Sequence, residues 1–269
     1  MLKTVTAYSG SYQCVLDMSA SEADGALIFD ITGITEDSRE ISVDKLATRT
    51  VISSIAPKQR IIVMSIRITD VDVETRRKTL SSVFKAGNSV RLVFETDIVE
   101  MREIRGVVES CNNPVFTKES TMVVTLICPD SVFYAEPVTV SLDPPDPANP
   151  HTANNPGDVP SGCTITITLD GTVATGPATI THASGVQMSF DMAKVDALAG
   201  GIAAGDVITV DSGYKKRCTL SRTGSSFNIF SAVSLPYTWI QIAPDEIDIT
   251  LDGFGASGEL VYSPGYGGL

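Results

Sequence analysis

Apolar and polar residues alternate with a period of two along most of the chain, which is the pattern of half-buried β-strands. The predicted strands of the first half are residues 25–32, 61–69, 89–96, 104–109 and 121–128. Val90, Leu92 and Phe94 would share one buried face. Residues 35–58 are more polar and show no clear period, and we assign them to a long loop or arm.

One segment of the first half predicts a helix, over about residues 72–86. Its apolar residues form one helical stripe: Val73, Leu80, Val83 and Phe84. Asp72 is a suitable N-cap, Glu74 lies in the first turn where the helix dipole favours an anion, and Gly87 is a suitable stop. We expect this helix to lie on an edge or a face of the sheet.

The second half predicts many short strands separated by turn residues, which is typical of a β-sandwich. The predicted strands are residues 163–169, 178–181, 187–190, 206–211, 218–220, 237–242, 247–251 and 259–262. Ile165, Ile167 and Leu169 would face inward, with threonines between them facing outward. Residues 192–198 are the one candidate helix of this half.

A proline-rich polar stretch, residues 143–160, holds six of the chain's 14 prolines and lies between these two β-rich halves. Each proline fixes φ and lacks a backbone donor, so neither a helix nor a central strand should run through the stretch. We interpret it as a semi-rigid linker. The predicted organisation is a first domain over 1–142, the linker over 143–160 and a second domain over 161–269.

Composition agrees with two globular domains in a chain of 269 residues, of which 43% are hydrophobic and 19% charged. Disorder is expected only in the linker and in the glycine-rich residues 263–269. No apolar run approaches the roughly 20 residues that a membrane-spanning helix needs, and the first residues lack the apolar block of a secretion signal. We expect no membrane insertion, and folding in a cytoplasm.

The five cysteines do not form a metal-binding pattern, and their odd number disfavours a disulfide framework. They are Cys14, Cys111, Cys128, Cys163 and Cys218. Cys111 and Cys128 would be able to face each other on a hairpin, but small buried hydrophobes are the favoured interpretation. We expect no metal and no cofactor.

The net charge of −12 disfavours a protein that grips nucleic acid, because such binding needs clustered Lys and Arg. The two basic clusters are residues 76–78 and 215–217. In so acidic a chain they fit an exposed helix face, an exposed turn, or a contact with an acidic neighbouring subunit.

No group of residues predicts catalysis. The two histidines, His151 and His182, have no partners in a nucleophilic arrangement nearby in sequence. The acidic runs 70–72 and 245–248 suggest a calcium site or a carboxylate pair, but neither has a complete motif, and capping and solvated strand ends explain them better. Trp239 suggests a sugar-stacking platform or, more simply, core or interface packing. We expect a protein that is not an enzyme, with no catalytic, cofactor-binding or metal-binding residues.

Five short motifs in a fixed order resemble the phage tail protein family that includes the distal tail protein of long non-contractile tails. They are residues 126–130, 133–134, 155–158, 205–211 and 259–262. Each motif is weak alone, but their order around one proline-rich stretch is more specific, and together they extend over most of the chain.

The resemblance implies a mainly β fold with two domains: an N-terminal β-sandwich with one helix and a galectin-like C-terminal β-sandwich. It implies a structural hub, with the first domain in a ring, usually of six copies, at the distal end of the tail tube. The partners it implies are further copies of the chain, the tail tube protein, a tail-associated hub protein, and receptor-binding or other baseplate proteins. The chain would then belong to the virion and be assembled in the cytoplasm of the bacterial host.

In such a ring DNA passes through the lumen without sequence-specific binding, and a negative lining would keep phosphates from adhering. Solubilising surface charge explains the acidity equally well. The alternative function is a carbohydrate-binding surface or baseplate module. The polar constellation that galectins use for galactosides is absent here, since the nearest candidate, residues 182–185, lacks the polar partners.

Overall fold

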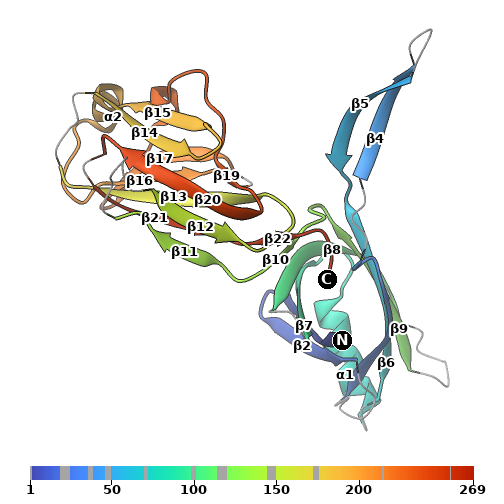
Figure 1. Ribbon diagram of the computed structural model, residues 1–269. Helices are drawn as coiled ribbons and strands as arrows, with labels where there is room; N and C mark the ends of the chain where they lie inside the picture. The colour runs from blue at the N-terminus through green and yellow to red at the C-terminus, as the bar shows by residue number, and fades with distance from the viewer. Residues whose placement is uncertain are drawn as a thin grey trace. The chain divides into compact units, whose positions relative to one another are not determined.

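The computed structural model describes the chain except for residues 1, 19–24, 36–38, 46–49, 70–71, 98–100, 114–119, 144–149, 172–175, 214 and 255. For residues 39–45, 50–57, 246 and 256 it describes the backbone alone. The chain divides into two compact units (Figure 1). Unit 1 is Met1–Ala135 together with Tyr266–Leu269, and unit 2 is Glu136–Gly265. The fold is mainly β, as predicted.

Unit 1 is built on a nine-stranded sheet that closes on itself. Its strands are β1 (Leu2–Ser9), β2 (Tyr12–Asp17), β3 (Ala26–Thr32), β6 (Arg60–Ile68), β7 (Ser89–Thr96), β8 (Arg102–Asn112), β9 (Thr121–Cys128), β10 (Phe133–Tyr134) and β22 (Gly265–Tyr266). The order is β22-β10-β8-β7-β1-β2-β3-β6-β9, and β9 also pairs with β8. This last pairing makes a seven-stranded, barrel-like sheet from β8 round to β9.

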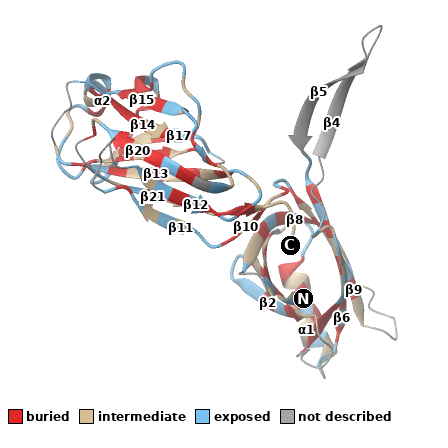
Figure 2. Ribbon diagram, in the orientation of Figure 1, coloured by how far each residue is buried: buried red, intermediate tan, exposed pale blue. Residues whose placement is uncertain are grey.

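The alternation of apolar and polar residues along the strands explains the hydrophobic core of unit 1. Val90, Leu92 and Phe94 of β7 are buried, and each buried position is followed by a more exposed one (Figure 2). Phe94 packs edge-on against Phe133, with ring centroids 5.6 Å apart. The barrel-like sheet therefore encloses its own hydrophobic core.

Helix α1 (Val73–Val83) lies against β1, β2 and β6 (Figure 1). As predicted, Asp72 is its N-cap, and the carboxylate accepts a hydrogen bond of 3.2 Å from the N–H of Thr75. The helix ends earlier than predicted. The chain turns at Gly87, as predicted, with φ at +87° and the Asn88 N–H donating to the Lys85 carbonyl at 2.9 Å. The side chain of Asn88 satisfies the last carbonyls of the helix, because Nδ2 donates to the oxygens of Ser82 and Val83 at 2.9 and 3.1 Å.

Residues 35–58, predicted as a long loop or arm, contain two strands that were not predicted. β4 (Arg39–Lys45) and β5 (Thr50–Pro57) pair with each other in a separate two-stranded sheet. The register places Ile41 opposite Ile55 and Val43 opposite Ile52. The strands were hard to recognise because β4 has only two apolar residues, Ile41 and Val43, and because Val51, Ile52 and Ile55 of β5 do not alternate.

Unit 2 holds two sheets whose residues contribute to one hydrophobic core. The larger sheet has the order β11-β21-β13-β16-β17-β18, with β19 also paired to β13, and the smaller has the order β12-β20-β14-β15. The larger contains β11 (Val138–Ser141), β13 (Ser161–Leu169), β16 (Val207–Asp211), β17 (Arg217–Arg222), β18 (Ser225–Asn228), β19 (Gln241–Ile242) and β21 (Ala256–Tyr262). The smaller contains β12 (His151–Asn155), β14 (Pro177–His182), β15 (Gln187–Asp191) and β20 (Asp245–Asp252).

The two helical segments of unit 2 are α2 (Met192–Ala199) and the 3-10 helix η1 (Phe230–Ala232). The first lies where sequence predicted a helix. No helix among the described residues is long and apolar enough to span a membrane.

The division between the units differs from the predicted one. Unit 2 begins at Glu136, and the predicted linker, residues 143–160, lies within it. β11 before the prolines pairs with β21, and β12 among them pairs with β20. The proline-rich stretch is therefore a connection between two sheets of one unit, part of which lies outside the described residues.

The glycine-rich end of the chain also differs from the expected disorder. Gly265–Tyr266 forms β22, which neighbours β10, and Leu269 donates a backbone hydrogen bond of 3.0 Å to Ile34. These residues return the chain to unit 1.

Candidate functional site

The two histidines flank one isoleucine in the smaller sheet of unit 2. His151 on β12 and His182 on β14 are both paired with Ile249 of β20. Nδ1 of the buried His182 accepts the Ser184 N–H at 3.1 Å and lies 2.7 Å from its hydroxyl oxygen. Burial lowers the pKa of His182, so its ring is neutral at pH 7 and stabilises a turn. Within the described residues, no three His, Cys, Asp or Glu side chains are grouped to hold a metal.

The acidic runs are not arranged as a convergent pair of carboxylates. Asp245 and Asp248 lie three positions apart on β20, and such positions face opposite sides of a sheet. Asp248 accepts a hydrogen bond of 2.8 Å from the hydroxyl of Thr152. Asp72 caps α1, and residues 70–71 lie outside the described part. Asp72 and Asp248 therefore have structural roles.

The basic cluster on α1 is divided by burial. Arg77 is buried and pairs with Glu74 at 2.8 Å, whereas Lys78 is exposed. In the second cluster, Arg217 lies 3.4 Å from the carboxylate of Asp211. Lys215 and Lys216 beside it are exposed, as expected for an exposed turn. Arg77 and Arg217 are engaged in ion pairs and are therefore not free to bind a nucleic-acid backbone.

The cysteines are free thiols in this structure, and four of the five are buried. On the hairpin of β8 and β9, Cys111 is opposite Val124 rather than Cys128. Burial raises the pKa of Cys14 and of Cys218 to about 12, which keeps both thiols protonated at pH 7. These thiols pack as small hydrophobic side chains.

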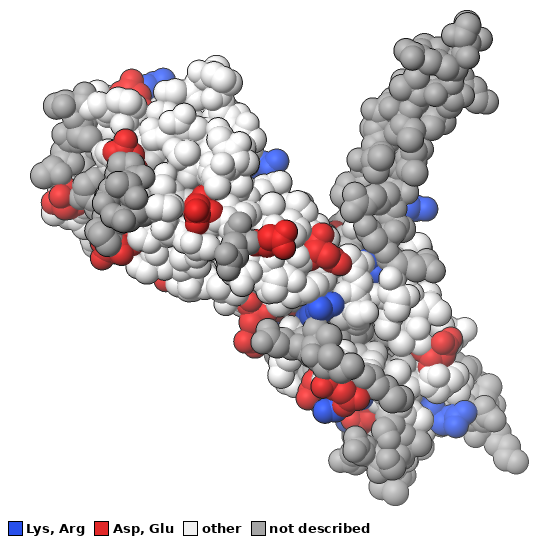
Figure 3. All heavy atoms as spheres, in the orientation of Figure 1, with Lys and Arg blue, Asp and Glu red and all other residues white. Residues whose placement is uncertain are grey.

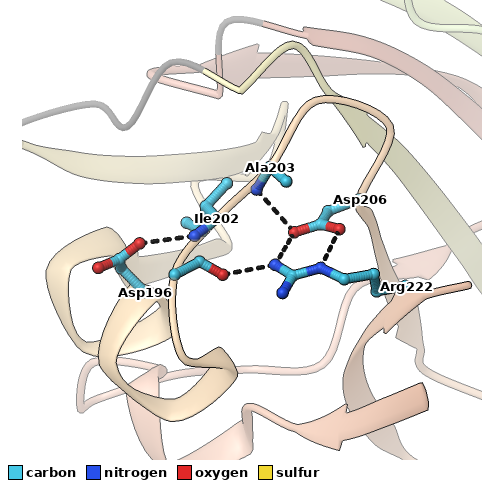
Figure 4. A network of polar contacts seen from close by, with 6 residues as sticks. Asp196, Ile202, Ala203, Asp206 and Arg222 are labelled. Atoms are coloured by element: carbon cyan, nitrogen blue, oxygen red, sulfur yellow. Dashed lines mark hydrogen bonds and ion pairs between the residues drawn. The ribbon is translucent and has the colours of Figure 1, made fainter.

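A partly buried ion pair that the sequence did not suggest connects the end of β17 with the residue that precedes β16 (Figure 4). Arg222 at the end of β17 donates from Nε and Nη2 to the two carboxylate oxygens of Asp206, at 2.8 and 2.6 Å. Asp206 is 2% exposed. The two hydrogen bonds from Arg222 hold the pKa of Asp206 below its usual value. Such a bidentate pair fixes both side chains in one orientation.

The same residues organise the connection between α2 and β16 (Figure 4). Arg222 Nη2 also donates to the Gly201 carbonyl at 2.5 Å, and the N–H of Ala203 donates to Asp206 at 2.9 Å. Asp196 of α2 accepts the N–H of Ile202 at 2.7 Å. This network shapes a surface loop and is best explained as structural.

Trp239 does not lie on the predicted strand 237–242, since only Gln241–Ile242 is extended. It stacks parallel to Phe230 with ring centroids 5.7 Å apart, and the ring of Tyr237 packs edge-on against both. All three rings are partly exposed and pack against the core of unit 2. Leu235, in the same connection, is 82% exposed. We call the rings of Phe230, Tyr237 and Trp239 the aromatic cluster.

The outward face of the unit 1 sheet carries an apolar row across three strands. Ile61 of β6 is opposite Ile127 of β9, which is opposite Val107 of β8. Ile61 and Val107 are 47% and 42% exposed, and Val123, farther along β9, is 39% exposed. We call these four residues the barrel patch. Exposed apolar groups that lie together mark interaction sites more often than single ones do.

The negative charge belongs mostly to unit 2, which has 14 Asp and Glu against 5 Lys and Arg. Unit 1 has 18 against 15. On the face drawn in Figure 3, the acidic side chains of unit 2 are scattered rather than gathered in one cluster. This distribution agrees with solubilising surface charge.

Known proteins match this chain in structure but not in sequence. No family model matches it, and no characterised protein sequence does. The Dit protein (gp 19.1) of phage SPP1, described as a paradigm of the hub of the adsorption apparatus in phages that infect Gram-positive bacteria, has a TM-score of 0.68 and 17% identity, over 98% of this chain and 99% of that one. A chain of the phage P2 baseplate, in its activated conformation with calcium, has a TM-score of 0.54 and 9% identity, over 97% and 98%. At these identities the likeness shows the fold, and the chain has the fold of a Dit-type tail protein, as the sequence motifs led us to expect.

Proposed function

We propose that the chain is a structural protein of a phage tail tip. Unit 1 forms a ring, which we expect to contain six copies, at the distal end of the tail tube. Unit 2, for which we propose a galectin-like β-sandwich, anchors receptor-binding or other baseplate proteins. The observation that carries this proposal is the fold shared over nearly the whole length of both chains with the SPP1 hub protein.

The outward face of unit 1 supports self-assembly. A closed ring needs two different complementary surfaces on each copy. The barrel patch is one surface with an apolar centre, and the centre of an interface is where burial contributes most to binding. The β4–β5 ribbon is a second candidate, because it pairs with no other described strand and a two-stranded sheet is only marginally stable alone.

The remaining parts of the proposal follow from the same role. The tail tube protein and a tail-associated hub protein would contact the ring, and DNA would pass through its lumen without sequence-specific binding. The chain would act in the virion after assembly in the cytoplasm of the bacterial host. No enzymatic step is proposed, and the candidate residues His182, Asp248 and Asp72 are engaged in a turn, a strand contact and a helix cap.

Negative-stain electron microscopy of the purified chain tests the proposal. We expect closed annuli with peripheral knobs. Ile61→Asp should abolish the annuli, because it places an unpaired charge in the barrel patch. Thr168→Asp, which adds the same charge at an exposed position of unit 2, is the matched control and should leave them intact. Separate two-lobed particles at every protein concentration would contradict the proposal.

A carbohydrate-binding module is the alternative, and the aromatic cluster is the observation that favours it. Partly exposed aromatic rings stack on the apolar faces of sugars, as they do in other complexes. Because Trp239 is the sole tryptophan, a bound sugar would change the fluorescence of one defined residue. A glycan array with a concentration-dependent fluorescence change would support this alternative, and a blank array would favour the structural role.

A further inference from the structure

Unit 2 is connected to unit 1 twice, at neighbouring places. The chain leaves unit 1 after Ala135, directly beyond β10, and returns at Tyr266 in β22. β10 and β22 are hydrogen-bonded neighbours in the sheet of unit 1. Unit 2 is therefore an insertion between two adjacent strands. The first connection is covalent, whereas the second depends on the non-covalent contacts that hold residues 266–269 to the rest of unit 1.

One buried guanidinium holds this segment at its middle. Arg60 of β6 is 2% exposed and donates to the carbonyl of Gly267. The same side chain donates to the carbonyls of Ser131 and Gly33, both at 2.8 Å, and lies over the ring of Phe133. It thus ties the returning chain to the segment that leads into β10. The two connections share one anchoring side chain.

A second arginine holds the end of the segment. Arg102 of β8 donates from Nη1 to the carbonyl of Gly268 at 2.7 Å, and its guanidinium lies 3.5 Å from the centre of the Tyr266 ring. Leu269 donates its N–H to Ile34, and both Tyr266 and Leu269 pack against the core of unit 1. Residues 266–269 are thus held to unit 1 by hydrogen bonds of their backbone, by the ring of Tyr266 and by the side chain of Leu269.

We propose that residues 266–269 act as a releasable strap that restricts the rotation of unit 2. A unit held by one flexible connection rotates about several backbone torsions, whereas two adjacent connections leave mainly a hinge about the line that joins them. The strap is short, so its local opening costs less free energy than unfolding of either unit. Release of the strap would therefore loosen unit 2 while both units stay folded.

The sole tryptophan gives a direct measurement. Trp239 lies in unit 2 and is stacked on Phe230, so its time-resolved fluorescence anisotropy reports the rotation of that unit without a label. We would compare the unaltered chain with Arg102→Met and with a variant lacking residues 267–269. Arg105→Met is the matched control, because Arg105 lies on the same strand with its side chain 73% exposed and paired with Glu103.

We expect both strap variants to show an added, shorter rotational correlation time that the unaltered chain and Arg105→Met lack. Identical decays in all four proteins would overturn the proposal. It would equally be overturned if the unaltered chain already showed the shorter component with the same amplitude. Amide exchange of β6 and β9 checks that unit 1 stays folded. If either strap variant loses this protection, Tyr266→Ala, which removes one ring and leaves both arginines, is measured in its place against the same two outcomes.

Discussion

Arg60→Met should strongly destabilise unit 1, because it removes three hydrogen bonds that one buried side chain donates. Arg60 is 2% exposed and donates to the carbonyls of Ser131, Gly33 and Gly267. Methionine retains much of the aliphatic volume and supplies no donor, so the change isolates the hydrogen bonds from the packing.

The expected magnitude follows from those three acceptors. A buried polar group that loses its partner costs about 1–3 kcal/mol. Part of this loss is recovered, because the charged guanidinium no longer has to be desolvated and the carbonyl of Gly267 can turn to water. We therefore expect unit 1 to lose about 3 kcal/mol, which at a urea dependence of about 2 kcal/mol/M lowers its midpoint by about 1.5 M.

Urea titration with two probes measures this loss for unit 1 separately. Far-UV circular dichroism follows both units, whereas Trp239 fluorescence follows unit 2 alone. The dichroism transition of unit 1 should shift, and the fluorescence transition should not. Arg105→Met is the control and should cost at most about 0.5 kcal/mol, since its ion pair is exposed. A loss below about 1 kcal/mol for Arg60→Met would refute the assigned role of the guanidinium.

Three further outcomes are expected. Gly33→Ala should destabilise unit 1 by at least about 1–3 kcal/mol, because φ is +83° and the added Cβ would lie 1.9 Å from the Ile61 carbonyl oxygen; an unchanged melting temperature would contradict this. The lowered pKa of Asp206 means that its ion pair stabilises unit 2 above the unfolded pKa of about 3.9 and that this contribution is lost as the pH falls through the folded value. The melting temperature of Asp206→Asn should accordingly lie below that of the unaltered chain at pH 7 and approach it near pH 3, and a pH-independent difference would argue against the pair. Ile61→Asp should elute from a sizing column as a smaller species with unchanged circular dichroism, and co-elution with the unaltered chain would exclude the barrel patch from the interface.

The strands that the sequence predicted best are those with one buried face. β7 occupies residues 89–96 as predicted, because Val90, Leu92 and Phe94 alternate with more exposed residues. The N-terminus of α1 was equally predictable, since an Asp before an apolar stripe has a local physical role as a cap. Such features depend on neighbours within a few residues.

The parts that the sequence did not predict depend on distant partners. Prolines mark an interruption of regular structure, but they do not tell whether the interruption lies between units or within one. Here β12 pairs with β20, about a hundred residues later, and this places the prolines inside unit 2. The glycine-rich end was predicted to be disordered from its composition. The prediction was wrong because the residues that hold it, Arg60 and Arg102, are far away in the sequence.

The sequence predicted the candidate interaction surfaces only in part. The barrel patch needs the register of three strands, which brings Ile61, Ile127 and Val107 into one row. Trp239 was recognised as an aromatic of interest, but its stacking on Phe230 depends on a non-strand conformation that alternation does not indicate. The Asp206–Arg222 pair had a weak local signal, the glycines before Asp206, and no signal for its partner.

The mass of the purified chain in solution tests the proposed ring most directly. Multi-angle light scattering over a range of concentrations should give one species whose mass is a fixed multiple of 28.5 kDa, six-fold if the ring matches the expected symmetry. A single species of 28.5 kDa at the highest attainable concentration would contradict a ring formed by this chain.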